Sequence, residues 1–77
     1  MILSKAQSEV VYNAMCALNN IGGRLEACIP TGERSGRTIR VTETHSGEII
    51  VSRGSGLFAS QENYPTQGEF ASAYSLS

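Results

Sequence analysis

The first segment with a helical pattern of apolar residues runs from Ser4 to Asn20. Its apolar residues recur at the spacing that a helix of about 3.6 residues per turn places on one face. They are Ala6, Val10, Val11, Ala14, Ala17, Leu18 and Ile21. Ser4 followed by Gln7 is a capping-box pattern, and Gly22 with Gly23 supplies the left-handed residue that ends many helices. The pattern predicts a helix that starts after Ser4 and stops near Asn20.

The other side of this predicted helix is less polar than a solvated surface usually is. Tyr12, Met15, Cys16 and Asn19 are spaced as neighbours there. Two interpretations stay open: an ordinary helix surface, or a second contact face for a partner or a symmetry mate.

Three later segments alternate between apolar and polar residues, as half-buried strands do. In 24–30, Leu25, Ala27 and Ile29 lie on one side, and Pro30 ends the strand. Segments 38–43 and 48–53 alternate in the same way. We expect three strands.

The register between the second and third strands follows from their pattern, because residues that lie opposite each other share a face. A three-residue loop of His45, Ser46 and Gly47, with Gly47 left-handed, puts Val41 opposite Val51. A loop of two or four residues would separate the apolar side chains, so we predict the three-residue loop.

The segment after Arg53 is rich in glycine and serine and predicts a turn-rich connection. Its apolar residues are expected to fold back over the core; they are Leu57, Phe58 and Tyr64. Thr66 with Glu69 is a second capping-box pattern. It predicts a short closing helix whose apolar residues are Phe70, Ala71, Ala73, Tyr74 and Leu76.

These elements predict an α+β fold in one domain, residues 1–77: a three-stranded antiparallel meander with the N-terminal helix packed on one face and a short C-terminal helix. The predicted core is Val10, Ala14, Leu18, Leu25, Ile29, Ile39, Val41, Ile49, Val51 and Phe70. A chain of 77 residues buries only about 60% of its unfolded surface. We therefore expect a dimer as readily as a monomer, and favour self-association as a homodimer or higher oligomer.

The charge is close to balance, with six Lys and Arg against seven acidic residues. This disfavours general nucleic-acid binding, which needs a broad positive field. Cys16 and Cys28 are interpreted as free thiols rather than a disulfide pair. The polar residues within the first 18 positions exclude a signal peptide and a membrane span, so we expect a cytoplasmic protein that does not bind membranes.

The residues for catalysis are sparse. His45 is the single histidine, sits at a predicted hairpin tip and is interpreted as a solvated turn residue. The acidic residues are scattered singly and give no metal-ligand spacing. We therefore expect no enzyme activity, no catalytic residues, no metal and no cofactor.

One cluster of charge is predicted from the topology. In a meander, the loop after the first strand and the segment after the third leave the sheet at the same end. Arg34, Arg37 and Arg53 would then meet beside several glycines, with Phe58 near enough to stack a base. This arrangement favours an anion or nucleotide site, although solvated loops and a protein-contacting surface remain open alternatives.

In size and character over its whole length, this near-neutral chain resembles the small proteins that phages and mobile elements encode against bacterial defence systems, anti-CRISPR proteins among them. No family motif carries individual residues across. The resemblance implies a non-enzymatic inhibitor that occupies a surface of a defence complex. The alternative is a protein that sequesters a nucleotide signal through its arginine and glycine loops. Tyr12, Met15 and the arginine loops would be the contacts in the first case.

Overall fold

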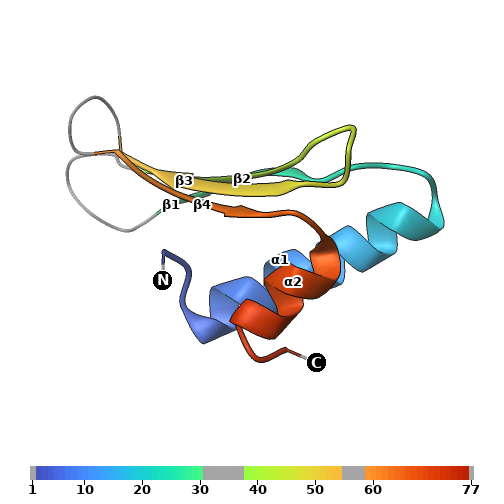
Figure 1. The fold of residues 1–77 in the computed structure, drawn as a ribbon, viewed down its shortest axis with the longest axis horizontal. Helices are drawn as coiled ribbons and strands as arrows, with labels where there is room; N and C mark the ends of the chain where they lie inside the picture. The colour runs from blue at the N-terminus through green and yellow to red at the C-terminus, as the bar shows by residue number, and fades with distance from the viewer. Residues whose placement is uncertain (1, 31–37, 55–58, 77) are drawn as a thin grey trace.

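The structure is a computed structural model that describes residues 2–30, 38–54 and 59–76. The elements in chain order are α1 (Lys5–Asn20), β1 (Glu26–Pro30), β2 (Thr38–Glu43), β3 (Ile49–Arg53), β4 (Ser60–Tyr64) and α2 (Gln67–Ala73). The strands form one antiparallel sheet in the order β1-β2-β3-β4. Both helices lie on the same side of this sheet (Figure 1). The predicted α+β class is confirmed, but the sheet has four strands rather than three.

The ends of α1 follow the predicted local signals. The Ser4 hydroxyl accepts a hydrogen bond from the Gln7 N–H at 3.1 Å, and the Gln7 side chain accepts one from the Ser4 N–H at 3.0 Å. After Ile21, the C-cap residue, Gly22 has a φ of +78°, which a glycine adopts without steric cost. The predicted capping box and helix stop are therefore confirmed.

The β2–β3 hairpin has the predicted loop and register. Val41 lies opposite Val51, and the Thr44 N–H donates to the Glu48 carbonyl at 2.9 Å. This pair leaves His45, Ser46 and Gly47 as the loop, and Gly47 has a φ of +89°. The prediction is confirmed because parity of the two apolar patterns allows only an odd loop length.

The expectation of a turn-rich connection up to Pro65 is wrong, because residues 60–64 form the edge strand β4. Tyr64 and Glu62 pair with Ile49 and Val51 of β3. The helix-facing positions of β4 are Ser60, Glu62 and Tyr64, so only one is apolar and no alternation of hydrophobicity marks the strand. Tyr64 packs against the core as expected, while Leu57 and Phe58 lie outside the described residues.

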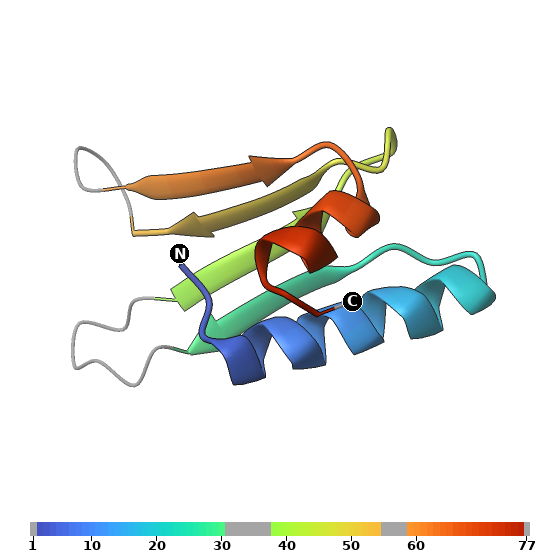
Figure 2. The same cartoon turned by 60° about the horizontal axis from the view of Figure 1, so that its bottom comes forward.

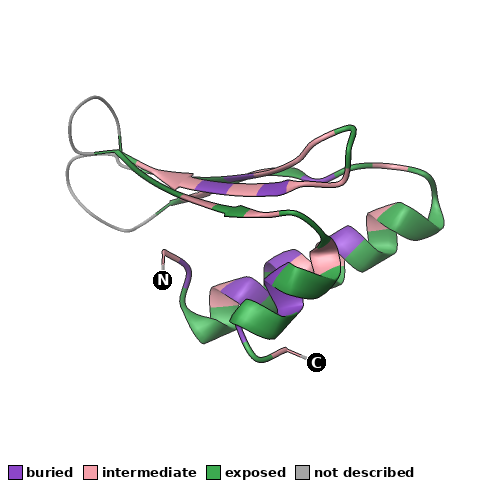
Figure 3. Ribbon diagram, in the orientation of Figure 1, coloured by how far each residue is buried: buried purple, intermediate pink, exposed green. Residues whose placement is uncertain are grey.

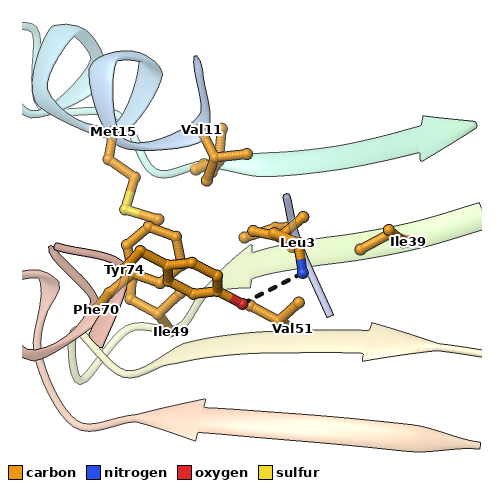
Figure 4. Close-up of a cluster of buried hydrophobic side chains, with 10 residues drawn as sticks. Leu3, Val11, Met15, Ile39, Ile49, Val51, Phe70 and Tyr74 are labelled. Atoms are coloured by element: carbon orange, nitrogen blue, oxygen red, sulfur yellow. Dashed lines mark hydrogen bonds between the residues drawn. The ribbon is translucent and has the colours of Figure 1, made fainter. Parts of the chain in front are cut away.

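The core lies between the sheet and the helices (Figures 3 and 4). Its buried side chains are Leu3, Val11, Met15, Leu25, Ile39, Val41, Ile49, Val51, Phe70 and Tyr74. Six predicted members are confirmed: Leu25, Ile39, Val41, Ile49, Val51 and Phe70. Ala14, Leu18 and Ile29 are only half-buried at its margin.

The prediction for Val10 is wrong, because its side chain is 69% exposed. Met15, assigned to a contact face, is instead fully buried. The apolar face of α1 is wide, and the sheet covers the half that contains Val11 and Met15. A helical wheel gives the width of an apolar face but does not say which part a sheet will cover.

The short helix α2 begins as predicted, with the Thr66 hydroxyl accepting from the Glu69 N–H at 3.1 Å. Phe70 packs edge-on against Tyr64, with ring centroids 5.5 Å apart, and in a tilted arrangement against Tyr74, with ring centroids 5.0 Å apart. Neither helix in the described part of the chain has the length and apolar character needed to cross a membrane.

Candidate functional site

The predicted arginine cluster requires the segments after β1 and after β3 to leave the sheet at the same end. Pro30 pairs with Thr38, and Arg53 pairs with both Ile39 and Ser60, so the strand ends that flank segments 31–37 and 55–58 lie at the same end. The antiparallel topology on which the prediction depends is therefore present. Arg53 shares the helix-facing side with Ile39 and is half-buried. Arg34, Arg37 and Phe58 lie outside the described residues.

The predicted contact face on α1 is divided by the structure. Met15 is removed from it by burial. Tyr12 is half-buried and lines a hollow of about 260 Å³ with Ser75 and Leu76. The Asn19 amide donates to the Gln67 side chain at 2.8 Å, which ties α1 to α2. Cys16 is exposed with a free thiol. These residues form no continuous free surface, because the C-terminal segment lies against part of it.

A cleft of about 340 Å³ lies at the hairpin end of the molecule, between the end of α1 and the β2–β3 loop. Its lining includes Arg24, Glu43 and His45. The Gln67 amide donates to Glu43 Oε2 at 2.7 Å, whereas Glu43 Oε1 is buried without a hydrogen-bond partner among the described residues. This oxygen is able to accept one further N–H or O–H donor. Sequence reasoning missed the cleft because its residues are far apart in the chain.

The half-buried carboxylate of Glu62 joins three segments of the chain. Its Oε1 accepts from the Tyr74 hydroxyl at 2.7 Å, the Tyr64 hydroxyl at 3.1 Å and the Ile2 N–H at 3.4 Å. The Tyr74 oxygen in turn accepts from the Leu3 N–H at 3.3 Å (Figure 4). This network fastens the N-terminal segment and α2 to β4.

The ionisation states of Glu62 and Tyr74 favour the hydrogen bonds of this network, which we call the Glu62 clamp because it ties the N-terminal segment and α2 to β4. Burial disfavours the Glu62 carboxylate, but the hydrogen bonds from Tyr74, Ile2 and Tyr64 outweigh it and hold its pKa below the ordinary value. Burial, and then the hydrogen bond to Glu62, raises the pKa of Tyr74. Both groups are therefore fixed in their ordinary states at neutral pH, Glu62 charged and Tyr74 neutral.

No group of three or more His, Cys, Asp or Glu side chains is placed to hold a metal ion within residues 2–30, 38–54 and 59–76. His45 is exposed at the hairpin tip, where the sequence placed it.

Neither helix covers the sheet face that is turned away from them (Figure 1). Strand pairing aligns two rows of side chains across it. One row is Cys28, Arg40, Ser52 and Gln61, and the other is Glu26, Thr42, Ile50 and Asn63. This surface, which we call the outer sheet face, is polar apart from Ile50 and Cys28. It requires the fourth strand, so sequence reasoning gave only part of it.

Comparison of the chain with protein-family models, with curated proteins and with solved structures found no match.

Proposed function

We propose that this protein is a non-enzymatic binding protein that occupies a surface of a macromolecular partner with its outer sheet face. The partner class suggested by the resemblance is a protein complex of a bacterial defence system, and the protein would be its phage- or mobile-element-encoded inhibitor. The observation that carries the proposal is a four-stranded sheet with both helices on one side, which leaves the other side available.

The side chains on the outer sheet face favour a protein partner over a nucleic acid. Arg40 stands in one row and Glu26 in the neighbouring row, among hydroxyl and amide groups. Such mixed charge offers donors and acceptors to a protein surface but no line of cations along which a phosphate backbone would run.

The area of the outer sheet face is smaller than a standard interface, so the partner would also contact residues beside this face. Four strands at a spacing of about 4.8 Å and five residues at about 3.4 Å each give a flat area of roughly 330 Å². A standard interface takes about 800 Å² from each partner. The contact would therefore extend past the strand ends at Pro30, Thr38 and Arg53, the end of the sheet for which the sequence predicts an arginine cluster.

The alternative function is sequestration of a phosphate-bearing nucleotide by Arg34, Arg37, Arg53 and Phe58. It is favoured by the strand ends that meet at one end of the sheet. A thermal-shift screen with cyclic and linear nucleotides tests it, because a ligand that binds only the folded state raises the melting temperature. A salt-sensitive rise supports sequestration, and flat responses across the panel remove it.

Quantitative capture from a host lysate tests the first proposal. A matched pair of variants is Ser52→Arg on the outer sheet face and Ser72→Arg on the exposed side of α2. We expect Ser52→Arg to abolish capture of the partner and Ser72→Arg to retain it, with bound proteins measured by mass spectrometry. Equal capture by both variants would contradict the assignment to this face.

A further inference from the structure

Strand β1 forms one edge of the sheet, and its outward backbone groups are identifiable. The Glu43 N–H donates to the Leu25 carbonyl at 2.9 Å. In an antiparallel pair, residues point their backbone groups alternately toward and away from the neighbour. The N–H and C=O groups of Glu26 and Cys28 therefore point away from β2, and the side chains of both residues are exposed.

An apolar stripe on α1 lies beside this edge. Ala6, Val10, Ala17 and Ile21 fall within about 60° on a helical wheel. Val10 and Ile21 are 69% and 79% exposed. Ala6 and Val10 line an apolar hollow of about 240 Å³ with Ile29 of β1, and Figure 2 shows α1 running alongside β1. The stripe and the strand edge thus form one continuous surface.

We propose that a second copy of this chain occupies this surface, with β1 pairing antiparallel with β1 of the second copy and the two α1 stripes in contact. An occupant must bring an unpaired strand edge with an apolar helix beside it, and this chain carries both. A two-fold axis makes such a surface self-complementary. The proposal does not rest on the function proposed for the outer sheet face, although Glu26 and Arg40 of that face also lie near the dimer contact.

Hydrogen bonding selects one register. With Ala27 opposite Ala27 of the second copy, Glu26 pairs with Cys28 and Cys28 with Glu26, so all four outward N–H and C=O sets are used. A shift that centres the axis on Cys28 puts Glu26 opposite Pro30, which has no N–H to donate. A shift that centres it on Glu26 puts two carboxylates opposite each other, which destabilises the pair.

Charge complementarity supports the same register. Cys28 lies beside Arg40 in its own chain, and in this register the other neighbour of Cys28 is Glu26 of the second copy. Glu26 and Arg40 then stand two strands apart, about 9.6 Å, in one row. Their long side chains meet above the small Cys28 side chain, and the two-fold axis makes this ion pair twice.

The helices fit this register. A two-fold axis through Ala27, perpendicular to the sheet, sets the two α1 helices antiparallel. The hollow lined by Val10 and Ile29 places Val10 toward one end of β1, so Val10 faces a later residue of the other α1. Val10 then meets Ala17 of the second copy, and Ile21 meets Ala6. Each large apolar side chain packs on a small one.

Disulfide cross-linking tests the strand register in the full chain. In a Cys16→Ser, Cys28→Ser background, Ala27→Cys places two thiols at a non-hydrogen-bonded pair, where Cα atoms are about 4.5 Å apart and a disulfide is allowed. Asn63→Cys on β4 is the matched edge-strand control. We expect a covalent dimer from Ala27→Cys under mild oxidation and none from Asn63→Cys. Cross-linking through Asn63→Cys, or none through Ala27→Cys, would overturn the proposal.

Sedimentation equilibrium tests the apolar stripe. Val10→Asp introduces a charge at an exposed position, so the folded subunit remains, and circular dichroism checks this. Cys16→Asp is the control, because it introduces the same charge at an exposed position of the same helix about 80° or more around the helix from every residue of the stripe. We expect the wild type and Cys16→Asp to form dimers, and Val10→Asp to raise the dimer dissociation constant at least 100-fold. A monomeric wild type, or a dimer that Val10→Asp does not weaken, would contradict this interface.

Discussion

The two edges of the sheet differ in the side chains they turn toward the helices. At β4, Glu62 points inward, and its carboxylate is satisfied within the chain by Tyr74, Tyr64 and the Ile2 N–H. At β1, the inward residues are Ala27 and Ile29, and Ile29 borders an apolar hollow. An inward charge on an edge strand opposes pairing with another sheet. The β4 edge therefore carries an inward charge that opposes pairing with another sheet, whereas the β1 edge carries none, as the proposed pairing with a second copy requires.

The difference in packing beneath the two edges gives the largest expected effect. Phe70 is fully buried in the aromatic cluster beside β4, whereas Val10 is mostly exposed beside β1. We expect Phe70→Ala to lower the free energy of unfolding by about 3–5 kcal/mol, and Val10→Ala to change it by less than about 0.5 kcal/mol. Urea denaturation at concentrations where the protein is monomeric measures both. Similar losses would remove the contrast between the two edges.

The second largest expected effect is on the dimer dissociation constant, through the proposed ion pair between Glu26 and Arg40 of the second copy. Glu26→Lys or Arg40→Glu removes two symmetric pairs worth about 0.5–1 kcal/mol each, so each single variant should weaken the dimer about 5- to 30-fold. The Glu26→Lys, Arg40→Glu double variant should restore affinity. Sedimentation equilibrium measures the three constants, and a double variant weaker than either single one would contradict the register.

The β2–β3 hairpin and strand β4 differ in how far local sequence determines them. The hairpin loop was predictable because residue parity and Gly47 restrict the register. Strand β4 was not, because its inward Glu62 breaks the apolar alternation that identifies strands. The Glu62 carboxylate accepts a hydrogen bond from Tyr74, the residue that ends the last helix. A contact between residues so far apart in the chain leaves no local pattern in the sequence.

The candidate surfaces were less predictable than the fold. The residues expected to form a contact face were Tyr12, Met15, Cys16 and Asn19, but Met15 is fully buried in the core. The exposed apolar stripe instead contains Val10, which the helical pattern assigns to the core. Both outcomes follow from the breadth of the apolar face on α1, which exceeds the width that one sheet covers. An amphipathic pattern broader than the chain's own sheet is thus a signal for a second contact.

A substitution at the tip of the β2–β3 hairpin should have a smaller effect on stability and none on pairing at either edge of the sheet. Gly47 has a φ of +89°, with no atoms near the position of an added Cβ. Gly47→Ala should therefore lower the free energy of unfolding by about 1 kcal/mol through backbone strain alone, and leave the dimer constant unchanged. Thermal melts and sedimentation measure these quantities. Altered dimerisation would show that the hairpin end takes part in the interface.

The smallest effect is the acid sensitivity of the β4 edge. The pKa of Glu62 is lower in the folded state than the ordinary 4.5, so its contribution to stability is present above that pH and is lost as pH falls toward the folded value. We expect a loss below about 1 kcal/mol, because the carboxylate is only half-buried. Glu62→Gln should flatten this part of the acid-stability curve, whereas the exposed control Glu9→Gln should not. An unchanged curve for Glu62→Gln would remove the clamp interpretation.

Amide hydrogen exchange at the two edges tests the central claim most directly, since the outward N–H groups of β1 and β4 are compared within one sample. Glu26 and Cys28 should become protected as protein concentration rises, while Gln61 and Asn63 should exchange equally fast at every concentration. Protection of Gln61 and Asn63 instead, or no dependence on concentration at Glu26 and Cys28, would contradict the account.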